Sequence, residues 1–290
     1  MVSSRGFQGI KSTLMGFIAI VLWSLLALLT AASGAMPPFQ LAAICFGLAG
    51  LCGIAVALWR GRLQMAFIQP PKVWGLGIFG LFGYHFCYFT ALRNAPVIEA
   101  SLIAYLWPLL IVLFAACLPE GRLRYQHFFG AILGLSGAGL LITGGQGLNF
   151  NPGATLGYMM AGLCAVIWSS YSVLSRRFAD TPTDVITGYC CVSALLALGC
   201  HWVFETTLWP ENLLQWLAIA GLGLGPVGLA FFVWDHGMKK GNVALLGVLS
   251  YASPLFSTLL MIAVGFAEAT WTVLAACAAI TLGALIAAKA

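Results

Sequence analysis

The residues of this chain best suited to chemistry are aromatic rings with polar tips, placed in the middle of long apolar segments. Tyr84 and Tyr88 are four residues apart, so they share one face of a helix, with His85 about 100° around it. Such rings can stack on an amphipathic ligand, hold a cation against the ring face and exchange a few hydrogen bonds with it. Their types and spacing predict a binding site for a small molecule that contains a ring.

Rings with polar neighbours occur in the middle of four further apolar segments. The residues that we predict to bind substrate are Trp23, Tyr84, His85, Tyr88, Ser101, Tyr105, Trp107, Trp168, Tyr171, Ser172 and Tyr251. Each ring taken alone has an alternative role, because aromatic side chains in such segments also face lipid or pack between helices. Tyr84, His85 and Trp168 are the strongest candidates, since they combine mid-segment depth with polar neighbours.

Other tryptophans lie near the ends of the apolar segments, where the indole ring commonly anchors a helix at the membrane interface. The predicted interface anchors are Trp59, Trp74, Trp202, Trp209 and Trp271.

The elements that must position the predicted site are membrane-spanning helices. The 290 residues are 61% hydrophobic and 7% charged, whereas soluble domains are about 25% charged. A helix needs about 20 mostly apolar residues to cross a bilayer, and proline pairs and a Pro-Gly turn separate several such runs. We therefore predict an all-α membrane protein with ten transmembrane helices. The predicted helices lie near residues 12–33, 39–59, 73–92, 98–118, 127–143, 155–176, 184–204, 212–234, 243–264 and 270–288.

The positive charges predict how these helices are oriented. Ten spans place both termini on the same side, and of the 13 Lys and Arg residues only Arg93 falls in a loop on the opposite side. Because Lys and Arg concentrate in cytoplasmic loops, we predict cytoplasmic N- and C-termini. Arg93 is expected to pair with Glu99 at the outer mouth. No basic cluster exceeds two adjacent residues, so the lipid bilayer is an expected partner and nucleic acid is not.

The two halves of the chain resemble each other. A shift of 146 residues places Tyr105 on Tyr251, and the same shift places Pro108 on Pro254. Each half holds five predicted spans, so the second half must enter the membrane from the opposite side, as in the inverted repeats of secondary transporters. Pro108 and Pro254 interrupt helical hydrogen bonding and are predicted hinges, with static kinks as the alternative. The two predicted repeat domains are 1–146 and 147–290.

Three short stretches carry a resemblance to a known family. They are Ala91-Leu92-Arg93-Asn94-Ala95-Pro96, Tyr105-Leu106-Trp107-Pro108-Leu109 and Pro119-Glu120-Gly121-Arg122-Leu123. Together with the five-plus-five arrangement, they resemble the drug/metabolite transporter superfamily, EamA type. The aromatic-rich third and fourth spans are most similar to the aromatic amino-acid exporters of bacterial inner membranes. The resemblance implies a secondary transporter in such a membrane that exports Phe, Tyr and Trp by alternating access, with other neutral amino acids as further candidate substrates.

The energy source of transport is predicted from the charges that the spans lack. No Asp or Glu lies in the middle of a predicted span, whereas proton-coupled carriers commonly relay protons through such a carboxylate. His85 is the one strongly titratable group placed deep in a predicted span. We favour facilitated diffusion of the substrate over proton coupling through His85.

Other functions stay open at this stage. The main alternative is a proton-coupled exporter of aromatic cations or nucleobases, and import or a channel are further ones. The sequence contains no phosphate-binding loop, metalloprotease motif or serine-hydrolase motif, so enzyme activity, a cofactor and a metal site are not expected. No pattern defines the oligomeric state, and a monomer is expected.

Overall fold

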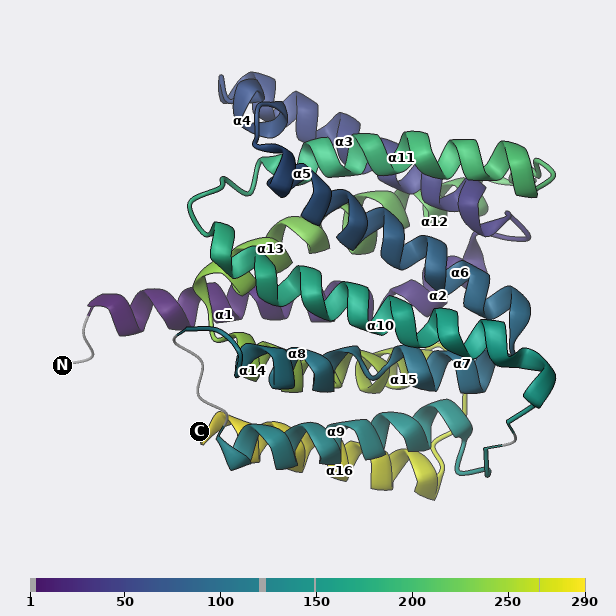
Figure 1. Cartoon of the computed structure of the whole chain (residues 1–290). Helices are drawn as coiled ribbons and strands as arrows, with labels where there is room; N and C mark the ends of the chain where they lie inside the picture. Colours follow the sequence, from purple (N-terminus) through teal and green to yellow (C-terminus); the bar gives the residue numbers. More distant parts are fainter. Residues whose placement is uncertain (1–3, 120–123, 149, 266, 290) are drawn as a thin grey trace.

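The computed structural model describes residues 4–119, 124–148, 150–265 and 267–289, and every regular element within these ranges is a helix (Figure 1). Residues 120–123 of the family-like stretch lie outside the described part. The elements are α1 (Ser4–Trp23), α2 (Leu26–Ala32), α3 (Pro38–Trp59), α4 (Leu63–Phe67), α5 (Pro71–Ile78), η1 (Phe79–Gly83), α6 (Tyr84–Asn94), α7 (Val97–Ala104), α8 (Trp107–Ala115), α9 (Tyr125–Thr143), η2 (Pro152–Ala154), α10 (Thr155–Ser175), η3 (Arg176–Phe178), α11 (Val185–Phe204), α12 (Leu213–Leu224), η4 (Gly225–Leu229), α13 (Ala230–Lys240), α14 (Val243–Leu249), α15 (Ala252–Ala263) and α16 (Trp271–Ala288).

Ten helical segments of the described chain are long and apolar enough to cross a membrane, so the predicted number of spans is confirmed. The largest difference from the prediction is at the end of span 8, which continues past residue 234 to Lys240. Its last turn can stay in the bundle because Lys239 pairs with Asp235 one turn earlier. Spans 1 to 10 are, in chain order, Gln8–Ala32, Pro38–Trp59, Pro71–Asn94, Val97–Ala115, Tyr125–Thr143, Pro152–Phe178, Val185–Phe204, Leu213–Lys240, Val243–Ala263 and Trp271–Ala288.

Several spans are interrupted near the middle of the membrane-spanning segment. Span 3 contains the π-helical turn η1, and span 8 contains the π-helical turn η4, which begins 146 residues later. Spans 4 and 9 are broken between α7 and α8 and between α14 and α15. Pro108 and Pro254 lie in the first turn of α8 and of α15, where the missing proline N–H is tolerated, so each break lies within four residues before its proline.

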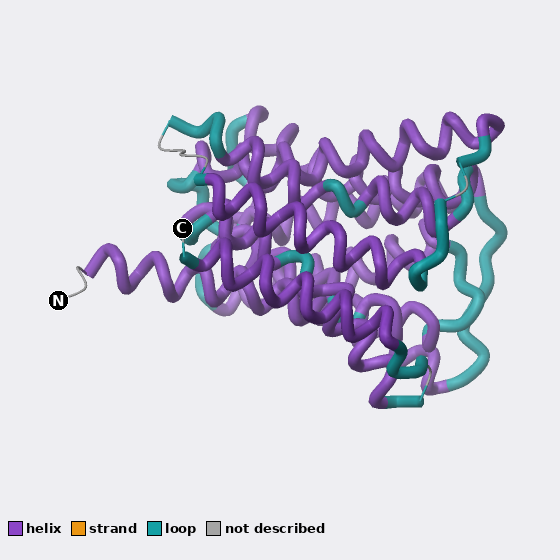
Figure 2. The backbone as a smooth tube through the Cα atoms, turned by 90° about the horizontal axis from the view of Figure 1, so that it is seen from below, coloured by secondary structure: helices purple, strands orange, loops and turns teal. Residues whose placement is uncertain are grey.

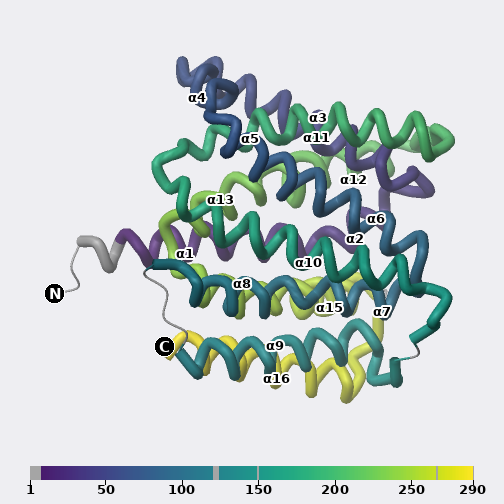
Figure 3. Tube along the Cα trace, in the orientation of Figure 1, coloured from purple at the N-terminus to yellow at the C-terminus, as the bar shows by residue number. Residues whose placement is uncertain are grey.

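The spans pack mainly on partners from the other half of the chain. Span 2 packs on span 7, span 5 on span 10, span 1 on span 8, and span 3 on span 6, while α8 of span 4 lies against α10 and α14. In Figure 3, α3 and α11 form one edge of the bundle and α9 and α16 the opposite edge, with the broken spans between them.

Glycine allows some of these helices to approach each other closely where they cross. A Cβ atom on Gly130 would lie 2.6 Å from the carbonyl oxygen of Gly283.

Both chain ends lie at the same end of the bundle, which we call the termini face; the opposite end is the distal face (Figures 1 and 2). The connections between spans 2 and 3, 6 and 7, and 8 and 9 lie at the termini face. Four of the five predicted interface anchors, Trp59, Trp202, Trp209 and Trp271, are 66% to 86% exposed at span ends. Trp74 is instead half-buried against Tyr189, with the ring centroids 5.7 Å apart.

Candidate functional site

The predicted aromatic residues meet in the middle of the bundle. The Trp23 ring at the end of α1 has its centroid 6.2 Å from Trp107 and 5.7 Å from Trp168. It also lies 6.3 Å from Phe231 and 5.0 Å from Trp234, both on α13. We call these five rings the central cluster. Spans 1, 4, 6 and 8 thus each contribute at least one large ring to a single cluster.

One face of α6 extends the central cluster toward span 3. Tyr84 and Tyr88 stack with centroids 5.9 Å apart and an interplanar angle of 7°, which confirms that they share a helix face. The Tyr84 ring lies 5.5 Å from Trp168. His85 lies 6.2 Å from Phe231 and 5.0 Å from Phe46 of span 2.

The backbone of η1 fixes the orientation of the His85 ring. The Nδ1 atom of His85 lies 2.7 Å from the carbonyl oxygen of Leu81. A carbonyl oxygen only accepts hydrogen bonds, so Nδ1 must carry the proton and donate it. When the ring is neutral, Nε2 is then a hydrogen-bond acceptor among the surrounding aromatic rings.

Exposure separates two kinds of predicted site residue. Tyr84, His85 and Tyr88 are half-buried, whereas Trp107, Trp168 and Tyr171 are 7%, 4% and 3% exposed. In the described part of the chain, no hydrogen-bond partner is present for the indole N–H of Trp107 or Trp168. These two indoles therefore have a donor to offer a ligand. Ser101 and Tyr105 lie on span 4 near Tyr88, with Ser101 close to the Tyr88 hydroxyl.

Other predicted site residues have polar partners inside the protein, as His85 does. The indole N–H of Trp23 donates to the carbonyl oxygen of Pro226 at 3.0 Å. The Ser172 hydroxyl accepts a hydrogen bond from the indole N–H of Trp234 at 3.1 Å. The Tyr251 hydroxyl accepts one from the backbone N–H of Leu109 at 3.2 Å, just after the break in span 4. Ser172 and Tyr251 are both fully buried, so they hold the walls of the site in place.

Sequence reasoning missed Phe46, Phe231 and Trp234. Phe46 and Phe231 carry no polar tip, and Trp234 lay at the end of a span that was predicted to stop there. The repeat contained the missing signal, because the shift of 146 residues places His85 on Phe231 and Tyr88 on Trp234. Phe231 and Trp234 are three residues apart, so they also share a helix face.

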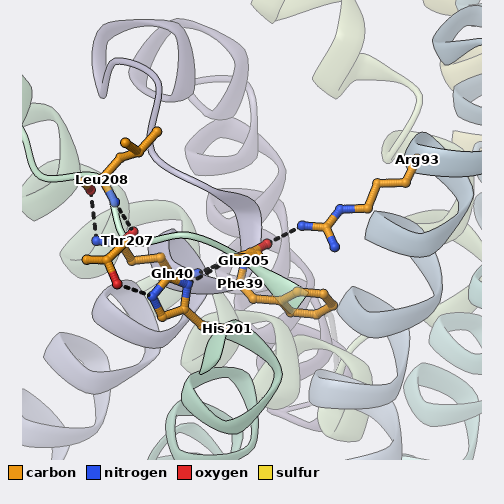
Figure 4. Close-up of polar contacts among 7 residues, drawn as sticks. All are labelled: Phe39, Gln40, Arg93, His201, Glu205, Thr207 and Leu208. Carbon is orange, nitrogen blue, oxygen red and sulfur yellow. Dashed lines mark hydrogen bonds and ion pairs between the residues drawn. The ribbon is translucent and has the colours of Figure 1, made fainter. Parts of the chain in front are cut away.

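A network of polar side chains links the distal ends of spans 2, 3 and 7 (Figure 4). The Glu205 side chain is 2% exposed and accepts the backbone N–H groups of Phe39 and Gln40, each at 3.0 Å. These are the first amides of α3, where the helix dipole favours a negative charge. His201 Nδ1 lies 3.0 Å from the second carboxylate oxygen, and the Arg93 guanidinium pairs with the first.

The ion pair of Arg93 differs from the one predicted. Arg93 was expected to pair with Glu99, and the structure pairs it with Glu205, the residue directly after span 7. The guanidinium also lies 5.3 Å from the centroid of the Phe39 ring, which packs on Phe89 of span 3. Packing of span 3 against α11 of span 7, together with its ring contacts to Phe39, brings Arg93 to Glu205, a neighbour that no local sequence pattern reveals.

Nothing in the described residues resembles a metal centre, since no three His, Cys, Asp or Glu side chains are grouped to hold an ion. What the central cluster can do is bind. Aromatic faces stack on flat or apolar groups and attract cations, and the free indole N–H groups can donate hydrogen bonds. A mostly apolar lining with a few polar groups is typical of a small-molecule site.

Comparison with known proteins gives one family for the whole chain. The model of the EamA-like transporter family matches it twice, at residues 10–143 and 155–288. The chain is 53% identical over 278 residues to the aromatic amino acid exporter YddG of Ancylobacter novellus, covering 96% of each. It is 30% identical over 266 residues to the protein of the same name from Escherichia coli, covering 86% of this chain and 87% of the relative. A crystal structure of a protein 53% identical to this chain superposes with a TM-score of 0.92 and covers 96% of both chains.

Proposed function

Because this chain belongs to the EamA-like transporter family, we propose that it is a secondary transporter that exports aromatic amino acids. The substrates are Phe, Tyr and Trp, together with other neutral amino acids, and the central cluster with the α6 face binds them. The observation that carries the proposal is the meeting of Trp23, Trp107 and Trp168 from three separate spans. The 53% identical relative, an aromatic amino acid exporter, supports the same substrate class.

The proposal includes two inverted repeats, 1–146 and 147–290. The double match to one family model and the equal spacing of η1 and η4 support a repeat. Five spans in each half give the halves opposite orientations. With Lys and Arg concentrated at the termini face, the N- and C-termini are cytoplasmic and the membrane is a bacterial inner membrane. The functional unit is a monomer.

Transport occurs by alternating access and facilitated diffusion. The breaks that precede Pro108 and Pro254 lie in equivalent spans, so they suit hinges that open opposite faces. The central cluster contains no carboxylate of the kind that proton relays commonly use, and the buried Asp235 near the end of span 8 is paired with Lys239. Proteoliposomes with and without an imposed proton gradient test this mechanism, and a strong dependence of flux on the gradient would overturn it.

Aromatic cations are the second candidate substrates, because the ring faces of the central cluster attract positive charge. Counterflow into proteoliposomes with labelled Phe, Trp, Thr and a cationic dye separates the candidates. A protein selective for aromatic amino acids exchanges Phe and Trp faster than Thr and faster than the dye. The reverse order for the dye would favour the cation exporter.

Replacing Trp168 with Ala tests the site itself. Removing a ring that contacts Trp23, Tyr84 and Trp107 should slow Trp counterflow at low substrate concentration by about tenfold. Tyr84→Ala and His85→Ala should also weaken aromatic substrates selectively. Trp271→Ala is the matched control, since that ring is 86% exposed at the start of α16 and should leave transport unchanged. Normal Trp transport by all three site variants would show that the site lies elsewhere.

A further inference from the structure

A small cavity lies at the termini-face end of the substrate path, directly beside the central cluster. Its volume is about 10 Å³, room for about one water molecule. The side chains that line it include Val73, Leu76, Tyr171, Tyr189, Asp235 and Lys239. The Tyr171 ring forms the link to the central cluster, since its centroid lies 5.4 Å from Trp168.

Two buried charges of opposite sign face this cavity. Asp235 and Lys239 are one turn apart on α13, with their charged atoms 2.9 Å apart and their side chains 2% and 4% exposed. Thr183 donates a hydrogen bond to the Asp235 carboxylate at 2.8 Å, and Lys239 donates one to the carbonyl oxygen of Thr181 at 3.0 Å. Burying such a pair is costly, and ionisable groups within a membrane span usually serve a function.

The pair matches a chemical feature that the central cluster does not address. A neutral amino acid carries an ammonium and a carboxylate on the same carbon atom. The rings of the central cluster offer stacking and indole N–H groups, but they bear no formal charge. The Asp235 carboxylate can accept hydrogen bonds from the substrate ammonium, and the Lys239 ammonium can pair with the substrate carboxylate. The Asp235–Lys239 ion pair is then replaced by two ion pairs with the substrate, and no buried charge is left unpaired.

We propose that Asp235 and Lys239 form a loading site for the zwitterionic head of the amino acid at the termini face. The proposal rests on the proposed function. With no substrate, the two side chains pair with each other and close this end around a water-sized space. When this end opens, the substrate zwitterion binds between Asp235 and Lys239, and the substrate side chain lies against Tyr171. The substrate then moves on to the central cluster, which Tyr171 contacts through Trp168.

Substrate analogues that lack one charge test the loading site. Phenethylamine has no carboxylate, and 3-phenylpropionate has no ammonium. Inside-out and right-side-out membrane vesicles containing the full chain take up labelled Phe while each unlabelled compound competes. The unchanged protein in vesicles that expose the termini face should prefer Phe over either analogue by about tenfold or more, the usual effect of a lost charged hydrogen bond.

Each charge should control one preference only. Lys239→Gln should remove the preference for Phe over phenethylamine and keep the preference over 3-phenylpropionate. Asp235→Asn should do the opposite, and both effects should be confined to vesicles that expose the termini face. Lys239→Arg should keep both preferences, which separates loss of charge recognition from loss of fold. Thr183→Val keeps both charges and should weaken the ammonium preference only partly.

Arg62→Gln is the matched control. Arg62 pairs with Asp184 at 3.1 Å on the same face but does not line the cavity, so this variant should keep both preferences. Slower transport in Lys239→Gln and Asp235→Asn with unchanged preferences would overturn the loading site and leave the pair as a closing contact. Absence of labelled Phe uptake by the unchanged protein would instead overturn the proposed function.

Discussion

At the scale of single residues, the site depends on buried side chains whose hydrogen bonds fix the orientation of the aromatic rings. Ser172 is fully buried, and its hydroxyl accepts the indole N–H of Trp234, which is 1% exposed. Ser172→Ala would leave that donor unpaired in an apolar setting, which costs about 1–3 kcal/mol. We expect a lower temperature of thermal unfolding and a higher KM for Trp, because the Trp234 ring loses its fixed orientation.

A matched variant on the surface provides the comparison for Ser172. Ser136→Ala removes a hydroxyl that donates to the carbonyl oxygen of Ile132 on an exposed face of α9, so both measurements should stay at their original values. Equal behaviour of the two variants would contradict the role assigned to Ser172.

The sequence predicts part of the site at this scale and misses part for a physical reason. Trp23, Tyr84 and Trp168 meet as predicted, because mid-span depth and polar neighbours are local properties of a helix. Phe231 and Trp234 have the same helix position as His85 and Tyr88 in the repeat, yet they lack that local signature. Tyr251 has the signature, but its hydroxyl accepts a hydrogen bond from the backbone N–H of Leu109. This partner depends on how span 9 packs on span 4, which the local sequence does not reveal.

At the scale of elements, the broken spans need partners for the amides that their breaks release. The Leu109 N–H follows the break in span 4 and donates to the Tyr251 hydroxyl beside the break in span 9. Tyr251→Phe keeps the ring and removes this acceptor. The unpaired buried amide should destabilise the protein by about 1–3 kcal/mol, measured as a shift in thermal or denaturant unfolding.

Tyr158 offers the same bond in a different setting. Its hydroxyl accepts the backbone N–H of Asn151 at 3.0 Å near the exposed distal face, where water can replace it. Tyr158→Phe should therefore cost much less than Tyr251→Phe. A larger effect at Tyr158 would show that the bond between spans 4 and 9 does not support the breaks.

The positions of the breaks were predictable only where proline marks them. Pro108 and Pro254 indicate interruptions in spans 4 and 9, and the breaks lie just before each proline. The turn η1 in span 3 contains no proline, only Phe79-Gly80-Leu81-Phe82-Gly83, and no sequence rule assigned it. Its recurrence as η4 after 146 residues relates it to the repeat.

At the scale of the whole molecule, hydropathy and charge predicted the ten spans, and the pairing of the spans had to come from the structure. Apolar length is a property of each segment alone, so the span limits agree to within a few residues except at Lys240. The partners of each span depend on side-chain fit across the two halves. Arg93 illustrates this limit, because its carboxylate partner lies 112 residues away, directly after span 7.

The distal network joins three spans through one carboxylate, and its two charges should contribute unequally to stability. Glu205 is buried and holds the first amides of α3 and His201 as well as Arg93. The Arg93 side chain is 39% exposed, so its ion pair is worth about 0.2–1 kcal/mol. Glu205→Gln weakens several charge-assisted hydrogen bonds at once and should cost more than about 2 kcal/mol.

Thermal unfolding of the purified protein in Arg93→Gln and Glu205→Gln variants measures this difference, with each variant as the control for the other. The unfolding temperature of the Arg93 variant should lie close to that of the unchanged protein. The difference between the two should shrink at high salt, because salt screens an exposed ion pair. The Glu205 variant should unfold at a clearly lower temperature at any salt concentration, since its partners are mainly buried. Equal decreases in unfolding temperature for the two variants would mean that the network depends mainly on the ion pair of Arg93. The distal ends of spans 2 and 7 would then be joined chiefly through span 3.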